Sequence, residues 1–296
     1  MARKMMSLMN LFLCCKEKWR AIALGSLALC CLLVPGALSA EAQGISAIPS
    51  RDMPFKPGET LVYDISWSNI VTAGTATMEV KAGETPDGKQ VLRFIVTTHT
   101  AGLVDVFYSV SDRLESVFDP EIRQSLSFNL NEKHGKKKRR TELVFDHADR
   151  TVVSKVNDDP PKTFTIPDPV QDALSSLYYL RTREDFTIGK DISIDVFDGG
   201  KNWSVDVHIL GREKVKTPAG DFSTIKVRTF PKYKGVFMNT GEIFIWLTDD
   251  SRRLPVLMKS TIAIGSIVST LTSMKLSDEG PPAEKPAPSP DKEAAR

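Results

Sequence analysis

Apolar and polar residues alternate, position by position, along much of this chain between residues 60 and 276. In the first such segment, Leu61, Tyr63, Ile65 and Trp67 occupy every second position. A period of two is that of a β-strand, whose successive side chains point to opposite faces of a sheet. The pattern returns in residues 76–80, 126–130, 143–145, 192–196, 203–209, 243–247 and 254–258. We therefore expect an all-β domain.

Short turn sequences separate these segments at the intervals expected for hairpins. They are Pro86-Asp87-Gly88, His134-Gly135, Asp198-Gly199-Gly200, Thr217-Pro218-Ala219-Gly220 and Asp249-Asp250. Hairpins join antiparallel neighbours, whereas parallel strands need long crossovers. About a dozen strands are more than a small open sheet holds comfortably. The sequence thus predicts a mainly antiparallel, curled sheet or barrel-like domain, with a β-sandwich as the second architecture.

One segment departs from the period of two. Asp168 is a suitable N-cap, Pro169 suits the first helical position, and Gln171 completes a capping box. Apolar residues then follow at helical spacing as far as Arg181. This pattern predicts one amphipathic helix over 168–181, whose apolar face we expect to cover or plug an end of the curled sheet.

The first 42 residues have the features of an export signal. Basic residues precede an uncharged run over 21–40, and an Ala-x-Ala sequence stands at 40–42. Residues 1–42 are therefore predicted to be a signal peptide. An N-terminal anchor is the alternative, because the run is close to the roughly 20 apolar residues that span a bilayer. In both cases the domain is expected in the periplasm, either free or anchored to the inner membrane.

All four cysteines lie within this N-terminal segment, at Cys14, Cys15, Cys30 and Cys31. Lipidation of Cys30 is disfavoured, because the bulky Leu29 precedes it where a small residue is needed. Cleavage would leave a chain without thiols. Such a chain has neither disulfides nor a cysteine-ligated metal, and it is not a thiol enzyme.

The remaining chain is organised as one domain between two loose ends. Residues 43–54 read as a linker, 55–276 as a β-rich domain, and 277–296 as a disordered tail of Pro, Ala, Glu and Lys. The 39 Lys and Arg residues outnumber the 37 Asp and Glu residues only because the first 42 residues hold five basic and two acidic ones. A nearly neutral domain argues against nucleic acid as a partner.

The densest charge in the domain is a run of five basic residues: Lys136, Lys137, Lys138, Arg139 and Arg140. The run follows a turn between two predicted strands, so we expect it at the tip of a hairpin. Such a tip is a candidate binding site for anionic lipid head groups or an acidic polymer. The alternative is a solvated strand end that discourages edge-to-edge aggregation.

A second charged cluster joins two carboxylates to two arginines. Asp249 and Asp250 precede Arg252 and Arg253. A hydrolase could use Asp249 or Asp250 as its acid or base, with Arg252 or Arg253 steering an anionic substrate. Asp250, Arg252 and Arg253 are also candidate binding residues. The alternative interpretation is a hairpin turn whose charges pair with one another.

No motif of a known catalytic or cofactor site stands out. The sequence has no G-x-S-x-G, H-E-x-x-H, Walker or G-x-G-x-x-G pattern. Its four histidines, His99, His134, His147 and His208, are not spaced as metal ligands. We therefore predict no catalytic residue, no metal and no cofactor.

Five motifs together resemble a known family. They are Gly58-Glu59-x-Leu61-x-Tyr63, Ala73-Gly74-x-Ala76, Asp172-x-x-Ser175 through Tyr179-x-Arg181, Thr217-Pro218-Ala219-Gly220-Asp221-Phe222, and Trp246-Leu247-x-x-Asp250 through Arg253-Leu254-Pro255-Val256. In this order they resemble the exported bacterial family called domain of unknown function 3108. The resemblance implies a β-rich, barrel-like periplasmic domain. It supplies no established activity and no catalytic residues.

The function expected from these features is that of a non-catalytic periplasmic protein of the cell envelope. Its curled sheet would bind a lipophilic ligand in an apolar cavity, an envelope polymer, or an envelope protein, with contact to the membrane surface or through an N-terminal anchor. Two other hypotheses stay open. One is a carboxylate-dependent periplasmic hydrolase, and the other is a structural module tethered to the inner membrane.

Overall fold

The computed structural model describes residues 53–68, 71–107, 109–233, 236–237, 242–261 and 265–277. The predicted signal peptide or anchor, 1–42, lies outside the described residues. The same is true of residues 43–52 of the predicted linker and residues 278–296 of the predicted tail. Within the described part of the chain, no helix has the length and apolarity needed to cross a bilayer.

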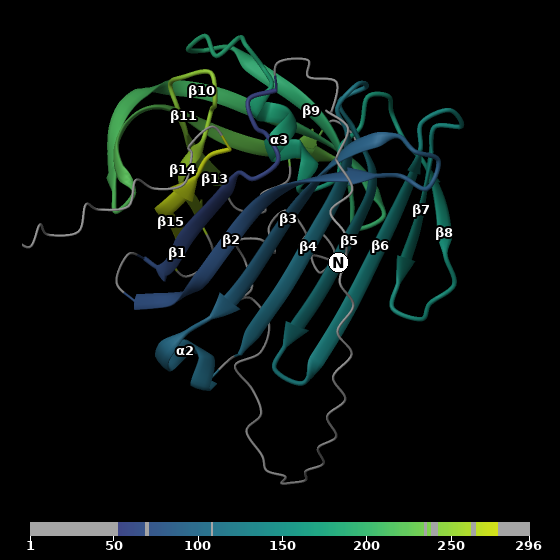
Figure 1. Cartoon of the computed structure of the whole chain (residues 1–296), viewed down its shortest axis with the longest axis horizontal. Helices are drawn as coiled ribbons and strands as arrows, with labels where there is room; N and C mark the ends of the chain where they lie inside the picture. Colours follow the sequence, from purple (N-terminus) through teal and green to yellow (C-terminus); the bar gives the residue numbers. More distant parts are fainter. Residues whose placement is uncertain are drawn as a thin grey trace, which may run out of the picture.

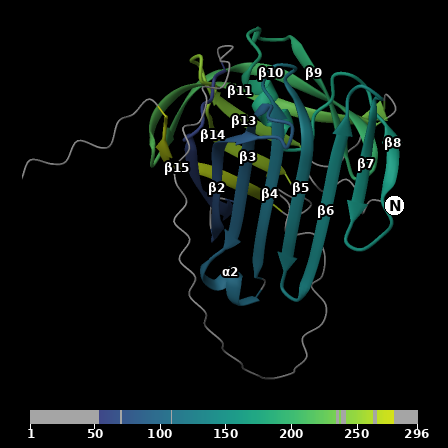
Figure 2. The ribbon, with the colours of Figure 1, turned by 45° about the vertical axis from the view of Figure 1, so that its right-hand side comes forward.

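In the described chain, fifteen antiparallel strands form one sheet that curls over on itself without closing (Figures 1 and 2). The strands are β1 (Thr60–Trp67), β2 (Val71–Glu84), β3 (Gln90–Thr100), β4 (Val110–Asp119), β5 (Gln124–His134), β6 (Lys137–Asp146), β7 (Thr151–Val156), β8 (Lys162–Thr165), β9 (Asp191–Asp198), β10 (Lys201–Thr217), β11 (Gly220–Tyr233), β12 (Val236–Phe237), β13 (Ile243–Thr248), β14 (Pro255–Thr261) and β15 (Ser266–Lys275). Their order across the sheet is β8-β7-β6-β5-β4-β3-β2-β1-β15-β14-β13-β11-β10-β9, and β12 pairs with β11. The predicted fold class is confirmed.

The first and last strands lie side by side in the middle of this sheet. Tyr63 of β1 is opposite Ala76 of β2 on one side and Leu271 of β15 on the other. One half of the sheet therefore consists of β1–β8 and the other of β9–β15, and Figure 2 shows the long strands of the first half in front of the second. Apolar side chains of both halves fill the space between them. We call the side that faces this core the inner face, and the opposite side the outer face.

The two edge strands, β8 and β9, approach each other through side chains. The ring of Phe164 on β8 lies 5.4 Å from that of Phe197 on β9. The side-chain amide of Asn202 donates a hydrogen bond to the carbonyl oxygen of Thr165 at 2.8 Å. Gln171, in the segment that follows β8, forms a parallel bridge with β9. These contacts hold the two edges of the sheet close together, although β8 and β9 are not joined by a ladder of backbone hydrogen bonds.

The helix on the inner face is α3 (Ser175–Arg181), which is shorter than the helix predicted over 168–181. The predicted start was wrong because the backbone of Gln171 is hydrogen-bonded to β9 and takes no part in a helix. A further helix, α2 (Gly102–Phe107), lies between β3 and β4 and was not predicted. Figure 1 shows α3 inside the curl and α2 at the opposite end of the long strands.

A buried carboxylate sets the actual start of α3. Asp172 Oδ1 accepts hydrogen bonds from the backbone N–H groups of Leu174 at 2.7 Å and Ser175 at 2.8 Å. Asp172 Oδ2 accepts hydrogen bonds from the hydroxyls of Ser116 on β4 and Ser125 on β5, both at 2.5 Å. Burial raises the pKa of Asp172, while these hydrogen bonds act in the opposite direction. The cap of the helix is thus fastened to two strands.

Aromatic rings pack the other end of α3 against the sheet. Tyr178 stacks on Phe94 of β3 with ring centroids 3.7 Å apart. Phe55, which precedes β1, meets both rings edge-on, at 5.3 Å from Phe94 and 5.1 Å from Tyr178. Edge-to-face and stacked pairs of this kind stabilise a core beyond the area that they bury.

A buried ion pair ends α3 and ties it to the beginning of β1. The guanidinium of Arg181 makes two hydrogen bonds to the carboxylate of Glu59, at 2.7 and 2.8 Å. Two backbone carbonyls, of Arg252 and Pro54, accept further hydrogen bonds from Arg181 at 3.2 and 3.3 Å. Its side chain is 0% exposed and that of Glu59 4% exposed. One guanidinium therefore joins the helix to two segments distant from it in sequence, the chain just before β1 and the turn between β13 and β14.

We predict that Glu59→Gln lowers the free energy of unfolding by about 3–5 kcal/mol, because it leaves the Arg181 charge buried without its carboxylate. The control is Asp221→Asn, which removes an exposed ion pair with Lys216 and should change stability by less than about 1 kcal/mol. Urea denaturation measures both. Equal effects of the two substitutions would contradict the prediction.

Candidate functional site

The predicted basic run forms the turn of the β5–β6 hairpin and the start of β6. Lys136 lies in the turn, and Lys137 begins β6. Because side chains alternate along a strand, Lys138 and Arg140 lie on the outer face and Arg139 lies on the inner face. The run therefore does not act as one patch. It is divided between the two sides of the sheet.

An open groove of about 590 Å³ lies over β3–β7 beside this hairpin. Its basic outer-face side chains come from four neighbouring strands: Arg113 of β4, Lys133 of β5, Lys138 and Arg140 of β6, and Lys155 of β7. We call these five residues the basic groove. The other residues that line it are Thr97, His99, Ser111, Asp112, Asn131, Glu132, Arg139, Glu142, Asn157 and Asp158.

Among the described residues, the lysines of the basic groove form no ion pairs. Lys133 and Lys138 are directly opposite each other in the β5–β6 register. Neither of them, nor Lys155, forms an ion pair with any residue in the described part of the chain. Like charges directly opposite each other on a sheet are destabilising. The lysine and arginine residues that line the groove outnumber its aspartate and glutamate residues by six to four, so the groove has an excess of positive charge that would stabilise an anion.

The arginines of the basic groove are held differently. Arg113 Nη2 lies 3.0 Å from the carboxylate of Glu115, and Arg140 pairs with Glu142 on the same strand. These glutamates fix the guanidinium groups beside the lysines. Sequence reasoning missed Arg113, which is distant from the basic run along the chain. Only the strand register brings it into the groove.

The inner face of the same hairpin carries a buried polar cluster. Nε2 of His134 lies 3.0 Å from both carboxylate oxygens of Asp112, and this contact raises the pKa of His134 above its ordinary value of about 6.5. Burial raises the pKa of Glu132, although Arg139 lies 3.8 Å from its carboxylate and lowers it. These contacts position β5 and β6 under the basic groove.

The second predicted cluster is the turn between β13 and β14. Asp250 Oδ1 accepts hydrogen bonds from the hydroxyl of Thr248 at 2.6 Å and from the backbone N–H groups of Arg252 and Arg253. Its Oδ2 accepts from the Arg252 guanidinium at 2.7 Å. Burial would raise the pKa of Asp250, but the hydrogen bonds from Thr248 and Arg252 lower it on balance. A general acid needs a raised pKa, so this geometry favours a charged, structural carboxylate.

The two predicted clusters lie at opposite ends of the domain. The carbonyl of Arg252 accepts a hydrogen bond from Arg181 at the end of α3, and Arg212 donates to the Asp249 carboxylate at 2.8 Å. The basic groove lies near the β5–β6 turn, at the other end of the long strands, where Figure 1 shows α2. The structure therefore does not unite Asp250, Arg252 and Arg253 with the basic run in a single site.

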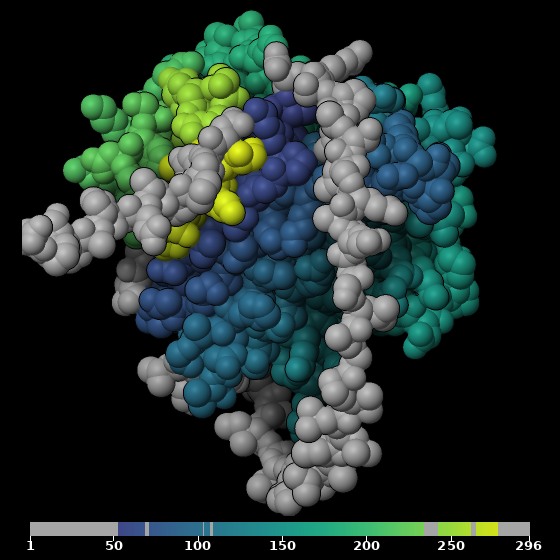
Figure 3. All heavy atoms as spheres, viewed as in Figure 1, coloured from purple at the N-terminus to yellow at the C-terminus, as the bar shows by residue number. Residues whose placement is uncertain are grey.

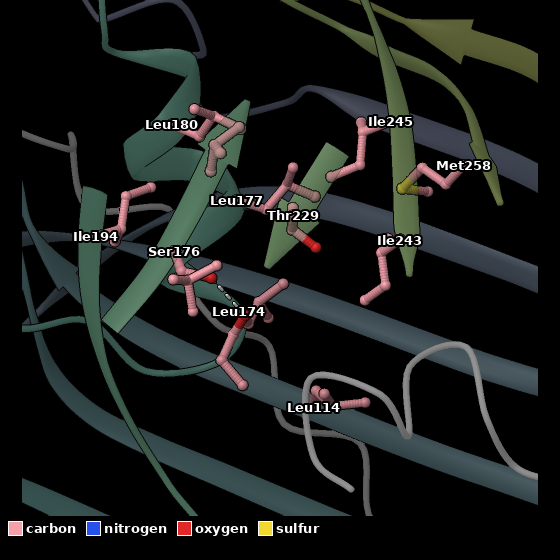
Figure 4. Close-up of a pocket in the computed structure, with 13 residues that line it drawn as sticks. Leu114, Leu174, Ser176, Leu177, Leu180, Ile194, Thr229, Ile243, Ile245 and Met258 are labelled. Atoms are coloured by element: carbon pink, nitrogen blue, oxygen red, sulfur yellow. Dashed lines mark hydrogen bonds between the residues drawn. The ribbon is translucent and has the colours of Figure 1, made fainter. Parts of the chain in front are cut away.

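One cavity in the apolar interior of the described chain is small. Between α3 and the second half of the sheet, a cavity of about 50 Å³ is left (Figure 4). A ligand pocket usually measures about 300–1,000 Å³. The side chains that surround the cavity are Leu114, Ala173, Leu174, Ser176, Leu177, Leu180, Ile194, Val205, Val207, Thr229, Ile243, Ile245 and Met258. Because α3 occupies the curl, the cavity has no room for a lipid chain.

The outer face of β9 and β10 brings together three groups that sequence spacing did not reveal. Asp191, Asp206 and His208 place one ligand atom each within 4.8 Å of the others. Nδ1 of His208 lies 2.6 Å from the Asp191 carboxylate, and the ammonium of Lys232 pairs with Asp206. Such a set is chemically suited to a divalent cation. Here, however, the Asp206 carboxylate already pairs with the ammonium of Lys232, and the Asp191 carboxylate already contacts the imidazole of His208.

Comparison with known proteins places these features in a family context. A family model described as "Protein of unknown function (DUF3108)" matches residues 62–272, which confirms the resemblance found in the sequence. Comparison with the curated proteins gives no match.

Several solved structures are similar to the chain. A β-barrel-like protein of domain of unknown function DUF1849 from Brucella abortus is 13% identical, with a TM-score of 0.52, and the match covers 74% of this chain and 98% of that one. A Bacteroides fragilis protein described as exported, with a YmcC-like fold, is 12% identical over 75% of this chain and 98% of its own, with a TM-score of 0.34. A Parabacteroides distasonis protein described as a lipoprotein is 9% identical over 75% and 97%, with a TM-score of 0.32. The first of these shares the fold.

We predict that His134→Gln removes a pH-dependent part of the stability. Because the folded protein raises the pKa of His134, its contribution is fully present below pH 6.5 and is lost as the pH rises through the folded-state value. The difference in free energy of unfolding between the native chain and the variant should therefore be larger at pH 5.5 than at pH 8.5, by about 1.4 kcal/mol for each unit of pKa shift. Urea denaturation at the two pH values measures it. A difference that does not change with pH would be evidence against the Asp112–His134 contact.

Proposed function

The chain belongs to the DUF3108 family of proteins of unknown function, and for this member we propose a non-catalytic role in the cell envelope. Its ligand is an anionic envelope polymer, bound at the basic groove. The observation that carries this proposal is the juxtaposition of Lys133, Lys138 and Lys155 on one open face without ion-pair partners in the described chain. The predicted signal peptide or anchor in residues 1–42 supports the envelope as its location.

The electrostatic repulsion between the lysines of the basic groove supports a binding role. Lys133 and Lys138 repel each other across the strands, whereas Arg113 and Arg140 nearby are each matched by a glutamate. A neighbouring phosphate or carboxylate would remove this repulsion and gain charge-assisted hydrogen bonds. The lysine ammonium groups are compact and tolerate varied geometry, which suits a repeating polymer better than one small molecule.

The dimensions and polarity of the groove also support a polymeric ligand. It crosses five strands, a width of about 19 Å at the usual strand spacing. Its rim offers neutral hydrogen-bonding groups, among them Thr97, Asn131 and Asn157. An open, polar surface of this width fits a chain of anionic units and provides no enclosed compartment for a single one.

Other functions have less support. A lipophilic ligand would need a larger interior than the 50 Å³ cavity around α3. A hydrolase built on Asp249 and Asp250 would rely on carboxylates that already accept hydrogen bonds from Arg212 and Arg252. A purely structural module would not need the repulsive lysine pair.

We predict that Lys133→Gln with Lys138→Gln weakens binding of short-chain polyphosphate, used as a soluble polyanionic probe. The matched control is Lys214→Gln with Lys259→Gln, which removes two exposed lysines from β10 and β14. Each lost phosphate contact should lower the slope of log affinity against log salt by about 0.7–0.9.

Isothermal titration calorimetry at several salt concentrations measures these slopes, and a melting curve of each variant controls for folding. The groove variant should lose about 1.4–1.8 from the slope and the control about nothing. Equal losses in both variants, or no binding by the native chain, would refute the proposed function.

A further inference from the structure

Exposed apolar side chains gather at the end of the sheet that also carries the basic hairpin. Trp67 at the end of β1 is 45% exposed, and Val71, opposite it at the start of β2, is 40% exposed. Val106 of α2 is 78% exposed. By contrast, Trp203 and Trp246 are buried in the core. Partly exposed large apolar side chains near one end of a sheet are typical of an interaction site.

The apolar group and the basic hairpin belong to one continuous end of the domain. The backbone N–H of Ala101, just before α2, donates to the carbonyl of Ala73 on β2 at 3.0 Å. The N–H of Gly135 in the hairpin turn donates to the carbonyl of Ser109, just after α2, at 2.7 Å. Helix α2 thus links the β1–β2 end to the β5–β6 turn. Figures 1 and 2 show these strand ends and α2 along the same lower edge.

This edge is long enough to meet a surface. From β1 to β6 it covers five strand spacings, or about 24 Å. In Figure 3, the atoms of α2 lie at the lower left of the coloured residues. The edge therefore presents an apolar section, formed by Trp67, Val71 and Val106, followed by a basic section, formed by Lys133, Lys136 and Lys138.

The chemistry of the two sections matches the surface of an anionic lipid bilayer. Tryptophan is enriched at membrane interfaces, where its apolar ring and polar N–H both find partners. Lysines beside such anchors are attracted by anionic head groups. One exposed carboxylate at this edge, Asp105 of α2, accepts a hydrogen bond from the Thr100 hydroxyl at 2.6 Å. The negative charge of Asp105 opposes binding to anionic head groups only in part, because three lysines of the basic section lie at the same edge.

We propose that this end of the domain docks on an anionic bilayer, with Trp67, Val71 and Val106 at the boundary between head groups and acyl chains and Lys133, Lys136 and Lys138 among the head groups. The inference goes beyond the proposed function, with which it shares only Lys133 and Lys138 of the basic groove.

The test is binding of the chain from residue 43 onward, which contains every described residue, to two kinds of vesicle. One kind is phosphatidylcholine alone, and the other is phosphatidylcholine with phosphatidylglycerol. The native protein should sediment with the anionic vesicles and only weakly with the neutral ones. Trp67 is the one exposed tryptophan among the described residues, so brominated lipids should quench its fluorescence while Trp203 and Trp246 stay protected.

Substitutions separate the apolar section from the basic groove. Trp67→Ser with Val106→Ser should weaken binding to anionic vesicles at least about tenfold while polyphosphate binding stays unchanged. Lys133→Gln with Lys138→Gln should weaken vesicle binding roughly 25-fold, about fivefold for each lysine, and weaken polyphosphate binding as well. The matched control, Ile188→Ser with Leu210→Ser, removes two exposed apolar side chains elsewhere and should change neither.

Each outcome decides between the two proposals. If the native chain binds polyphosphate but not anionic vesicles, or if Trp67→Ser with Val106→Ser leaves vesicle binding intact, membrane docking is wrong and the proposed function stands. Vesicle binding without polyphosphate binding would overturn the proposed function instead. If the double variant does not fold, Val106→Ser alone replaces it. The Val106 side chain is 78% exposed, so this single substitution should not disturb folding.

Discussion

The buried pair of Arg181 and Glu59 is the interaction on which the interior of the domain depends. It fixes the end of α3 to the start of β1, next to the junction of the two halves of the sheet, and it also contacts the chain at Pro54 and Arg252. Two charges without water are costly to bury, so the hydrogen bonds of both partners must be made together. With Asp172 fastened to two strands at the other end, α3 is held along the inner face and fills the curl.

Because α3 fills the space inside the curled sheet (Figure 1), the surfaces open to a ligand lie outside the core. Folds built on a curled sheet commonly enclose a compartment, but here α3 reduces the free space to a small apolar cavity. The polar and charged groups that remain available are on the outer face and at the open strand ends. The basic groove and the apolar edge around α2 both lie outside the core that α3 fills.

Much of the fold could be predicted from the sequence because its dominant signal is local. Alternation of apolar residues such as Leu61, Tyr63 and Ile65 depends only on which face is buried, and the turn residues indicate hairpins. The start of α3 could not be predicted in this way. Asp168 and Gln171 form a plausible capping box, yet tertiary pairing with β9 takes the backbone of Gln171, and Asp172 is the residue that caps the helix.

The candidate site was less predictable, because it depends on strand register. The basic run could be seen in the sequence as five consecutive residues. Neighbouring residues of a strand point to opposite faces, so Arg139 lies on the inner face while Lys138 and Arg140 lie on the outer face. Arg113 and Lys155 joined that group from strands whose pairing the sequence does not reveal. The triad of Asp191, Asp206 and His208 escaped notice for the same reason.

The most direct measurement of the central claim is a map of ligand contacts by amide chemical shifts in the chain from residue 43 onward, titrated with polyphosphate. The account predicts that the largest shifts fall on β4–β7 around Lys133, Lys138 and Lys155, with little change in α3 or around the Asp249–Arg253 turn. Shifts concentrated on the cavity beside α3 or on that turn, with β4–β7 unaffected, would contradict it.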